Sequence, residues 1–336
     1  MSAVLSRVVP AAAPATPLVE ARGLTKDFDV SGGFLARAAA PVRAVDSVSL
    51  AIRPSEVLGV VGESGSGKST LGRLLLRLLE PTAGEVRFEG QDLLALPLRD
   101  LRRFRRHMQM VFQDPFASLN ARMTVGDALA EPLRLHRRLS AREARDAAAD
   151  LMRKVGLTSE HLGRYPRAFS GGQRQRVAIA RALASEPKFI VADEPVSALD
   201  VSIQAEVINL LRDLQRDLGL ALMFISHDLS VVEIMADRVM VLYLGRVMEE
   251  APTQALYARP AHPYTAALMQ AAPGARHDRP GIVLSGEIPS PRNPPSGCVF
   301  RTRCPFALPA CAEGRPALRE IAPSHRKACI RDDLVL

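Results

Sequence analysis

The chain has 336 residues, enough for one large α/β domain with an appendage or for two modest domains. Apolar residues make up 47% of it but aromatic residues only 4%, which favours aliphatic helices on a buried sheet over an aromatic-rich β-sandwich. No run of 18 apolar residues is present, so we expect no membrane-spanning helix. The net charge of +8 fits nucleic acid, anionic membranes or nucleotides as partners, and equally a solvated basic surface.

The first 17 residues contain one Arg, a short apolar run and three prolines. They make a poor signal peptide, so we predict a disordered lead-in over 1–17 and a cytosolic protein. Any association with a membrane would then go through partner proteins. The Arg-rich stretches 101–107 and 134–145 are typical of helix faces rather than of disordered tails.

Apolar runs rich in β-branched residues predict five strands. In chain order they are Val57–Val61, Met108–Phe112, Phe189–Ala192, Ala221–Ser226 and Arg238–Tyr243. Helical patterns lie between several of them, and the clearest is an apolar stripe from Ile203 to Leu218. The alternation of strands and helices indicates an α/β fold with a mainly parallel sheet and helices on its faces.

Two stretches depart from this alternation. Residues 124–164 read as an inserted helical subdomain, in which Ser140 and Glu143 form a capping-box signal and Thr124 is placed to cap an earlier helix. Residues 273–323 are Pro-rich and irregular. We therefore predict a main domain over 18–272, with the helical subdomain over 114–170, and an irregular, cysteine-containing C-terminal appendage over 273–336.

The strongest motif is a glycine-rich segment that fits G-x-x-x-x-G-K-[ST], namely Gly62-Glu63-Ser64-Gly65-Ser66-Gly67-Lys68-Ser69-Thr70. It follows a predicted strand and opens a helix over 71–79, which is the setting of a phosphate-binding loop. Its glycines let backbone N–H groups converge on phosphate oxygens, and the helix N-terminus adds a positive dipole. Lys68 is expected to reach the β- and γ-phosphates and the Ser69 hydroxyl to ligate Mg²⁺. The context argues against the alternative, a chance glycine-rich turn.

The predicted strand 189–192 runs directly into two carboxylates, Asp193 and Glu194. A buried parallel strand delivers the residues at its carboxyl end to the ligand edge of the sheet. We expect Asp193 to hold Mg²⁺ through water and Glu194 to act as general base on the attacking water. Alone, the pair would read as a solvated acidic turn; with the phosphate loop, it predicts hydrolysis of Mg-ATP.

A second loop suited to anions precedes the predicted helix 175–184, and it reads Ser170-Gly171-Gly172-Gln173-Arg174. One nucleotide does not need two such loops. A dimer does, because this loop would bind the γ-phosphate held by the facing chain. On the bare sequence, a flexible helix-capping loop stays open as the alternative.

These motifs resemble, in their order along residues 18–250, those of the ATPase subunits of ABC transporters. Phe169 stands where the family signature usually has Leu. The resemblance implies a P-loop NTPase fold of the ABC type, with a mainly parallel core, an antiparallel β part and an inserted helical subdomain.

The same resemblance assigns roles to four further positions. Gln113 matches the Q-loop, which binds Mg²⁺, senses the γ-phosphate and contacts membrane subunits. Asp200, in Ser197-Ala198-Leu199-Asp200, matches the D-loop at the dimer seam. His227 matches the switch histidine that contacts the γ-phosphate, and Phe28 the aromatic residue that stacks on adenine.

Segments 111–120 and 193–202 and the tail 289–329 are similar to those of the second of two ATPases in dipeptide and oligopeptide uptake systems. This implies two different ATPases, two membrane-spanning permeases and an external peptide-binding protein. The chain would lie at the cytoplasmic face of the inner membrane, held there by the permeases, with no nucleic acid partner. Related systems carry nickel or glutathione, so the cargo stays open.

The four cysteines, all near the C-terminus, are Cys298, Cys304, Cys311 and Cys329. In a cytosolic protein, clustered cysteines indicate a metal or cluster site rather than disulfides. Their spacing lacks the C-x2-C knuckles of a common zinc site, whereas four thiolates can hold a [4Fe–4S] cluster, which the resemblance also implies. Zinc and free thiols stay open as alternatives.

Two other functions share the ATP-binding motifs. A soluble ABC-type ATPase acting on nucleic acid or ribosomes fits the charge of +8, but the chain has one nucleotide unit and no long coiled-coil insertion. A P-loop kinase would leave the 170–174 loop, Asp200 and His227 without a role. The energy-coupling subunit of a peptide importer is therefore the preferred hypothesis.

Overall fold

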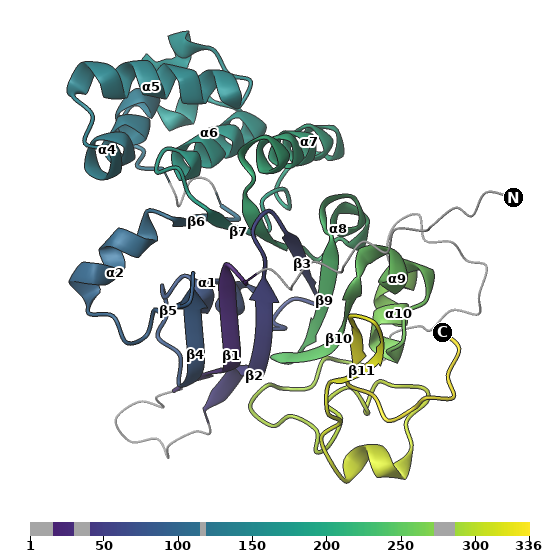
Figure 1. Ribbon diagram of the computed structural model, residues 1–336. Coiled ribbons are helices and arrows are strands. Elements are labelled where there is room, and N and C mark those ends of the chain that lie inside the picture. The colour runs from purple at the N-terminus through teal and green to yellow at the C-terminus, as the bar shows by residue number, and fades with distance from the viewer. Residues whose placement is uncertain (1–15, 30–40, 115–118, 272–285) are drawn as a thin grey trace, which may run out of the picture.

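An eight-stranded sheet forms the centre of the fold (Figure 1), with the strand order β11-β12-β10-β9-β3-β8-β7-β6. The computed structural model describes residues 16–29, 41–114, 119–271 and 286–336. Nearly all of the predicted lead-in over 1–17 therefore lies outside the described residues, as do 115–118 of the segment after Gln113.

Five neighbouring strands of this sheet are mutually parallel. They are β3 (Val57–Val61), β6 (Met108–Val111), β7 (Phe189–Asp193), β8 (Ala221–Ile225) and β9 (Arg238–Tyr243). All five were predicted, with ends that differ by at most one residue. β3, β7 and β8 are buried along their whole length, which is why they read as continuous apolar runs. The parallel arrangement brings their carboxyl ends to one edge of the sheet.

Alternate side chains of these strands face two separate hydrophobic clusters. On one face the sheet packs against α1 (Lys68–Leu75), which also contacts the second sheet. On the other face the cluster takes in side chains of several helices: α6 (Gly171–Leu183), α7 (Val201–Leu218), α8 (Leu229–Met235), α9 (Thr253–Ala258) and α10 (Pro263–Ala271). The predicted α/β arrangement with helices on both faces is confirmed.

The second sheet is antiparallel, as the family resemblance implied, and has the order β2-β1-β4-β5. Its strands are β1 (Val19–Phe28), β2 (Val42–Ile52), β4 (Ala83–Phe88) and β5 (Gln91–Asp92). Leu71, Leu74 and Leu75 of α1 pack in the same cluster as side chains from β1, β2 and β4. The helix that follows the phosphate loop is thus held between two sheets.

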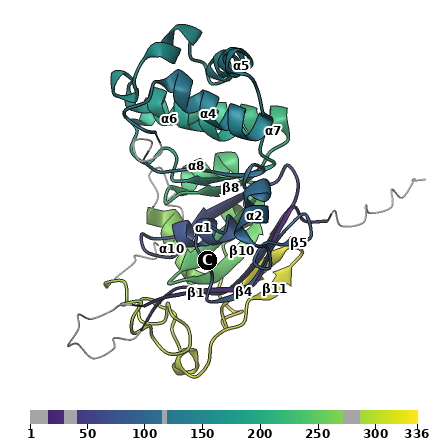
Figure 2. The ribbon, with the colours of Figure 1, turned by 90° about the vertical axis from the view of Figure 1, so that its left-hand side faces the viewer.

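The helices of the predicted insertion form a separate layer beyond the central sheet (Figures 1 and 2). They are α4 (Val125–Arg137), α5 (Ala141–Lys154) and two short 3-10 helices, η1 (Ser159–Gly163) and η2 (Pro166–Ala168). Both expected caps are present: Ser140 and Glu143 form a reciprocal capping box, and Thr124 Oγ1 accepts from the backbone N–H of Asp127 at 3.2 Å.

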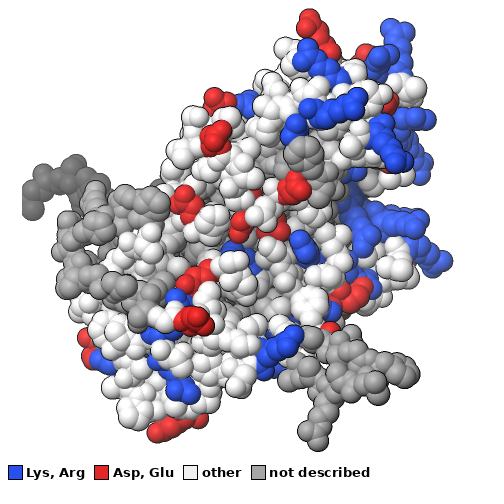
Figure 3. Space-filling model, turned by 180° about the vertical axis from the view of Figure 1, so that it is seen from behind, with Lys and Arg blue, Asp and Glu red and all other residues white. Residues whose placement is uncertain are grey.

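The helix α2 (Leu98–Arg105) presents Arg side chains to solvent and buries Leu101. Figure 3 shows Lys and Arg gathered on the side of the molecule where α2, α4 and α5 lie. The first predicted basic stretch, 101–107, therefore lies largely on α2, whereas the second, 134–145, is divided between the end of α4 and the start of α5.

The tail corrects the expectation of an irregular appendage. It contains a 3-10 helix, η3 (Pro309–Ala312), and two strands, β11 (Arg319–Ala322) and β12 (His325–Lys327). β12 pairs antiparallel with β10 (Arg246–Pro252), so the tail extends the central sheet. Strands of four and three residues are too short to give a periodic signal, and the prolines before them suggested a loop.

Buried charges join the tail to the sheet. Glu249 on β10 is fully buried, accepts from the backbone N–H groups of Ala261 and His262, and lies 2.7 Å from His325 Nε2. Its neighbour Glu250 pairs with Arg326 of the tail and with Arg238 of β9. Such pairs fix the register of β12 on β10, because a shifted strand would leave a buried carboxylate unpaired.

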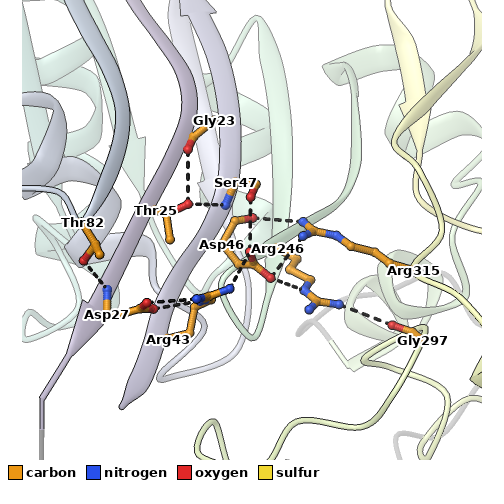
Figure 4. Close-up of polar contacts among 10 residues, drawn as sticks. All are labelled: Gly23, Thr25, Asp27, Arg43, Asp46, Ser47, Thr82, Arg246, Gly297 and Arg315. Carbon is orange, nitrogen blue, oxygen red and sulfur yellow. Dashed lines mark hydrogen bonds and ion pairs between the residues drawn. The ribbon is translucent and has the colours of Figure 1, made fainter. Parts of the chain in front are cut away.

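A second junction forms around Asp46 of β2 (Figure 4). The Asp46 carboxylate lies 2.7 Å from Arg246 Nε and 3.2 Å from Arg315 Nη1 of the tail. Arg246 also donates to the carbonyl of Gly297 at 3.4 Å. Burial alone raises the pKa of Asp46, but these arginines outweigh burial and hold it below its ordinary value.

Candidate nucleotide-binding site

The phosphate loop spans the turn between β3 and α1, where the sequence placed it. Gly62 has φ 152° and Gly67 has φ 100°. A Cβ atom at Gly62 would lie 2.1 Å from the carbonyl oxygen of Leu242, and one at Gly67 would lie 2.2 Å from that of Ala44. Only glycine fits these two positions, so the tight turn depends on them.

Lys68 begins α1 and folds back over the loop. Its Nζ donates to the carbonyl oxygens of Gly62 at 2.8 Å and Glu63 at 3.0 Å, and the residue is only 4% exposed. Burial lowers the pKa of Lys68, while the nearby carboxylates of Glu194 and Asp193 act in the opposite direction. A buried ammonium held by carbonyl oxygens is poised to exchange them for phosphate oxygens.

The two predicted Mg²⁺ ligands of the loop and the acidic strand are adjacent. Ser69 Oγ donates to Asp193 Oδ1 at 2.7 Å. Burial raises the pKa of Asp193, and the hydrogen bond from Ser69 opposes that shift. A hydroxyl and a carboxylate in contact beside a phosphate loop are a fitting donor set for Mg²⁺.

Glu194 connects the Q-loop with the end of β8. Its Oε2 accepts from Gln113 Nε2 at 3.1 Å and lies 3.4 Å from His227 Nδ1. Glu194 also has φ 47°, a left-handed conformation that few non-glycine residues adopt and that is found more often at functional sites. The structure therefore brings Lys68, Ser69, Gln113, Asp193, Glu194 and His227, from four separate segments, to one sheet edge.

The remaining predicted residues lie apart from this edge or on its rim. Ser170 caps α6 in a reciprocal capping box with Gln173. A Cβ atom at Gly171 would lie 3.3 Å from the side chain of Leu199, just before α7, and one at Gly172 would lie 2.4 Å from that of Ile203 on α7, so neither glycine faces the phosphate loop of the same chain.

Asp200 is the N-cap residue of α7, where the D-loop was expected. Phe28 ends β1 with 37% of its surface exposed, and Lys26 Nζ lies 5.2 Å from the centre of its ring. Its ring therefore stands at the surface, as an adenine-stacking residue requires.

Two residues that the sequence analysis did not single out also hold the phosphate loop. The hydroxyl of Tyr264 accepts from the backbone N–H of Glu63 at 2.9 Å. Arg303 of the tail makes a two-point ion pair with the Glu63 carboxylate, at 2.6 and 3.0 Å. Both partners are at least 200 positions away from Glu63 in sequence, so no local pattern could have found them.

The four cysteines all lie in the described part of the tail, as free thiols. Burial raises the pKa of Cys298 and Cys329, and that of Cys304 to about 11. Among the described residues, no group of three or more His, Cys, Asp or Glu side chains is arranged to hold a metal ion. The described residues thus show no preassembled metal centre, and the expected one stays a prediction.

Comparisons with known proteins agree with this site. Residues 45–197 match the ABC transporter family, and residues 248–311 match the oligopeptide/dipeptide transporter C-terminal region. A putative peptide import ATP-binding protein of Brucella ovis is 56% identical over 323 residues, 95% of this chain and 99% of that protein. The chain belongs to the ATP-binding proteins of ABC transporters.

Further relatives support the assignment. The oligopeptide transport ATP-binding protein AppF of Bacillus subtilis is 51% identical over 317 residues, 93% of this chain and 96% of AppF. Among solved structures, the dimeric, post-hydrolysis ATP-binding cassette MJ0796 bound to ADP and phosphate matches with a TM-score of 0.63 and 31% identity, over 70% of this chain and 98% of its own. The chain is thus an ABC-type ATPase. Among its described residues, no helix is both long enough and apolar enough to span a membrane.

Proposed function

We propose that this chain is the ATP-hydrolysing, energy-coupling subunit of an importer for dipeptides or oligopeptides. The observation that carries the proposal is the convergence of Lys68, Asp193, Glu194, Gln113 and His227 at the carboxyl edge of the central sheet. The match of residues 248–311 to the oligopeptide/dipeptide transporter C-terminal region supports peptides as the cargo.

The site assigns separate tasks to its residues. Backbone N–H groups of 62–70 and the Lys68 ammonium bind the β- and γ-phosphates, and Ser69, Asp193 and Gln113 hold Mg²⁺, directly or through water. When bound, Mg²⁺ neutralises charge that develops on the phosphate oxygens. Glu194 takes a proton from the attacking water, and His227 contacts the γ-phosphate.

A second ATPase subunit would complete the site. The loop 170–173 begins a helix, and Ser170 and Gly171 are exposed, so its N–H groups can meet a nucleotide held by the facing chain. Next to Asp200, Val201 leaves 82% of its surface exposed, which is an unusual place for a β-branched apolar side chain. Both features support a dimer seam formed by this loop and the D-loop, with Phe28 against adenine.

The face towards the membrane partners would lie beside β6. A groove of about 220 Å³ lies between β6, α4 and α6, and Phe112, which precedes Gln113, lines it. Leu135 also lines this groove with 70% of its surface exposed. Gln109, Glu131, His136 and Arg181 also line the groove, so it suits a permease segment that has both apolar and polar side chains. The chain would then work at the cytoplasmic face of the inner membrane, with two permeases and an external peptide-binding protein.

We also propose that the tail cysteines hold an iron–sulfur cluster, with a single zinc ion as the alternative. Backbone N–H groups of Leu308 and Arg331 point at Cys311 Sγ and Cys329 Sγ, each at 3.4 Å. Sulfurs of a cluster commonly accept such hydrogen bonds. Anaerobic purification should give a brown protein with stoichiometric iron and sulfide, and Cys304→Ser should lose both. A colourless, iron-free native protein contradicts this proposal.

Co-purification tests the importer. The tagged chain, extracted gently from membranes of its own host, should bring down a second ATPase and two permeases. Peptide presented with the external binding protein should then stimulate ATP hydrolysis in this complex, and a Lys68→Ala complex should show no such stimulation. Recovery of ribosomes or nucleic acid without membrane proteins would overturn the transport function.

A further inference from the structure

The phosphate loop has an ionic contact with the C-terminal tail that the roles above do not use. Arg303 Nη1 lies 2.6 Å from Glu63 Oε2, and Nη2 lies 3.0 Å from Oε1. Arg303 is only 7% exposed, and its Nη1 also lies 3.4 Å from the Tyr243 hydroxyl. A planar guanidinium in a two-point pair and in contact with a neighbouring ring system is held in one orientation.

Glu63 in turn connects these contacts with the residues that meet phosphate. It is the second residue of the loop, and its carbonyl oxygen accepts from Lys68 Nζ at 3.0 Å. Its backbone N–H donates to the hydroxyl of Tyr264, a residue of α10. The side chain, N–H and carbonyl of Glu63 thus all form polar contacts. The partners of the side chain and of the N–H lie after β10 in the sequence.

The ring system behind Arg303 is itself rigid. Tyr243, Tyr264 and Phe300 form a cluster with ring centres 4.7 to 5.4 Å apart, and all three are at most 1% exposed. Phe300 belongs to the tail, three residues before Arg303. The tail therefore presents the guanidinium to the loop from a packed base and not from a mobile surface.

Charge gives this contact a consequence for ATP. A carboxylate beside a bound triphosphate repels it, and the repulsion is strong where water is excluded. Arg303 pairs with the Glu63 carboxylate and so neutralises its charge. Without Arg303, the loop would carry an unpaired negative charge on Glu63, near Lys68 and the proposed phosphate site.

We propose that Arg303 is a positioning residue for ATP: it holds Glu63 and the phosphate loop, so that the C-terminal tail sets the affinity of the site for nucleotide. The proposal rests on the proposed nucleotide site and adds a residue that lies outside the ABC transporter match at 45–197.

A double-mutant cycle on the full-length chain tests this, with the dissociation constant of a fluorescent ATP analogue and the KM of hydrolysis as readouts. Arg303→Met should weaken binding and raise KM about tenfold, with a smaller change in kcat. In a Glu63→Gln background, the same substitution should have little further effect, because no carboxylate is left to neutralise. A residue that only supports folding would not be rescued in this way.

Arg301→Met is the matched control, because Arg301 lies two positions earlier in the same segment and bonds to Ser296. It should leave the affinity unchanged. Thermal unfolding of all variants shows whether each is folded, and Arg303→Lys, which keeps the charge but not the two-point geometry, should give an intermediate affinity.

Two outcomes separate the possible failures. The inference is overturned if the native chain binds ATP and Arg303→Met binds it equally well. It is also overturned if Arg303→Met costs as much affinity in the Glu63→Gln background as in the native chain. If the native chain does not bind ATP, or Lys68→Ala binds it as tightly, the nucleotide site itself is wrong.

Discussion

The acidic residues at two places on the central sheet are held in different ways. At the end of β7, Glu194 accepts one hydrogen bond from Gln113 and lies beside His227, whose side chain is 59% exposed. On β10, Glu249 is fully buried and accepts from two backbone N–H groups as well as facing His325. The Glu194 side chain is 17% exposed and so keeps some access to solvent, whereas the Glu249 side chain is 0% exposed and is fully committed to the fold. The difference indicates which charges serve chemistry and which serve assembly.

The largest expected effect comes from Glu194, the partly exposed carboxylate of this comparison. Glu194→Gln should lower kcat for ATP hydrolysis at least about 100-fold, because it removes the general base. ATP binding should persist, and the variant should accumulate as a closed dimer in size-exclusion chromatography with ATP. Glu233→Gln, an exposed carboxylate on α8, is the control. Unchanged turnover in Glu194→Gln would rule out the assignment of the base.

Around the buried Glu249, the free energy of unfolding should depend on pH through His262. Burial lowers the pKa of His262 to about 4, from 6.5 in an exposed histidine. As the pH falls from 6.5 to 4, the unfolded state therefore takes up a proton that the folded state does not. The free energy of unfolding should fall by about 3 kcal/mol across that range. Urea unfolding at several pH values measures this loss.

His262→Asn provides the comparison, because an Asn oxygen can replace Nδ1 as acceptor of the Tyr264 N–H, now at 3.0 Å. The variant should show a flatter dependence of unfolding free energy on pH than the native chain. Equal slopes in the two proteins would mean that other groups cause the acid loss.

The junction at Asp46 should matter less than the buried histidine. Asp46→Asn removes the charge shared by Arg246 and Arg315, and we expect a loss of about 2 kcal/mol in the free energy of unfolding. The loss should be greater in low salt than in high salt, because part of it is electrostatic. No dependence on salt would indicate that packing, rather than charge, holds the tail to β2.

The smallest effect is expected for an ion pair on the surface. Arg216 lies 3.2 Å from Asp213 on α7, and both side chains are more than half exposed. Arg216→Ala should change the free energy of unfolding by about 0.5 kcal/mol or less. A loss as large as that of Asp46→Asn would show that exposure does not separate the two classes of charge.

Whether a feature could be predicted from the sequence depends on how far apart along the chain its residues lie. A short run of residues determines each of three features: the phosphate loop, the end of β7 and each of the five parallel strands. The predictions of their type and position were therefore correct. The bonds of Glu63 to Tyr264 and Arg303 join segments 201 and 240 positions apart, and no local pattern reports them. The strands β11 and β12 were missed for a related reason, since their partner β10, rather than their own sequence, makes them strands.

The position of β12 also affects the order in which the protein is completed. β10 ends at Pro252, but its partner β12 begins only at His325. At a synthesis rate of about 5–20 residues per second, the edge of β10 stays uncovered for several seconds after it is made. An open strand edge is a template for pairing with other chains, so the nascent protein passes through a period of risk for aggregation. A chain cut before Arg319 would remain in that state.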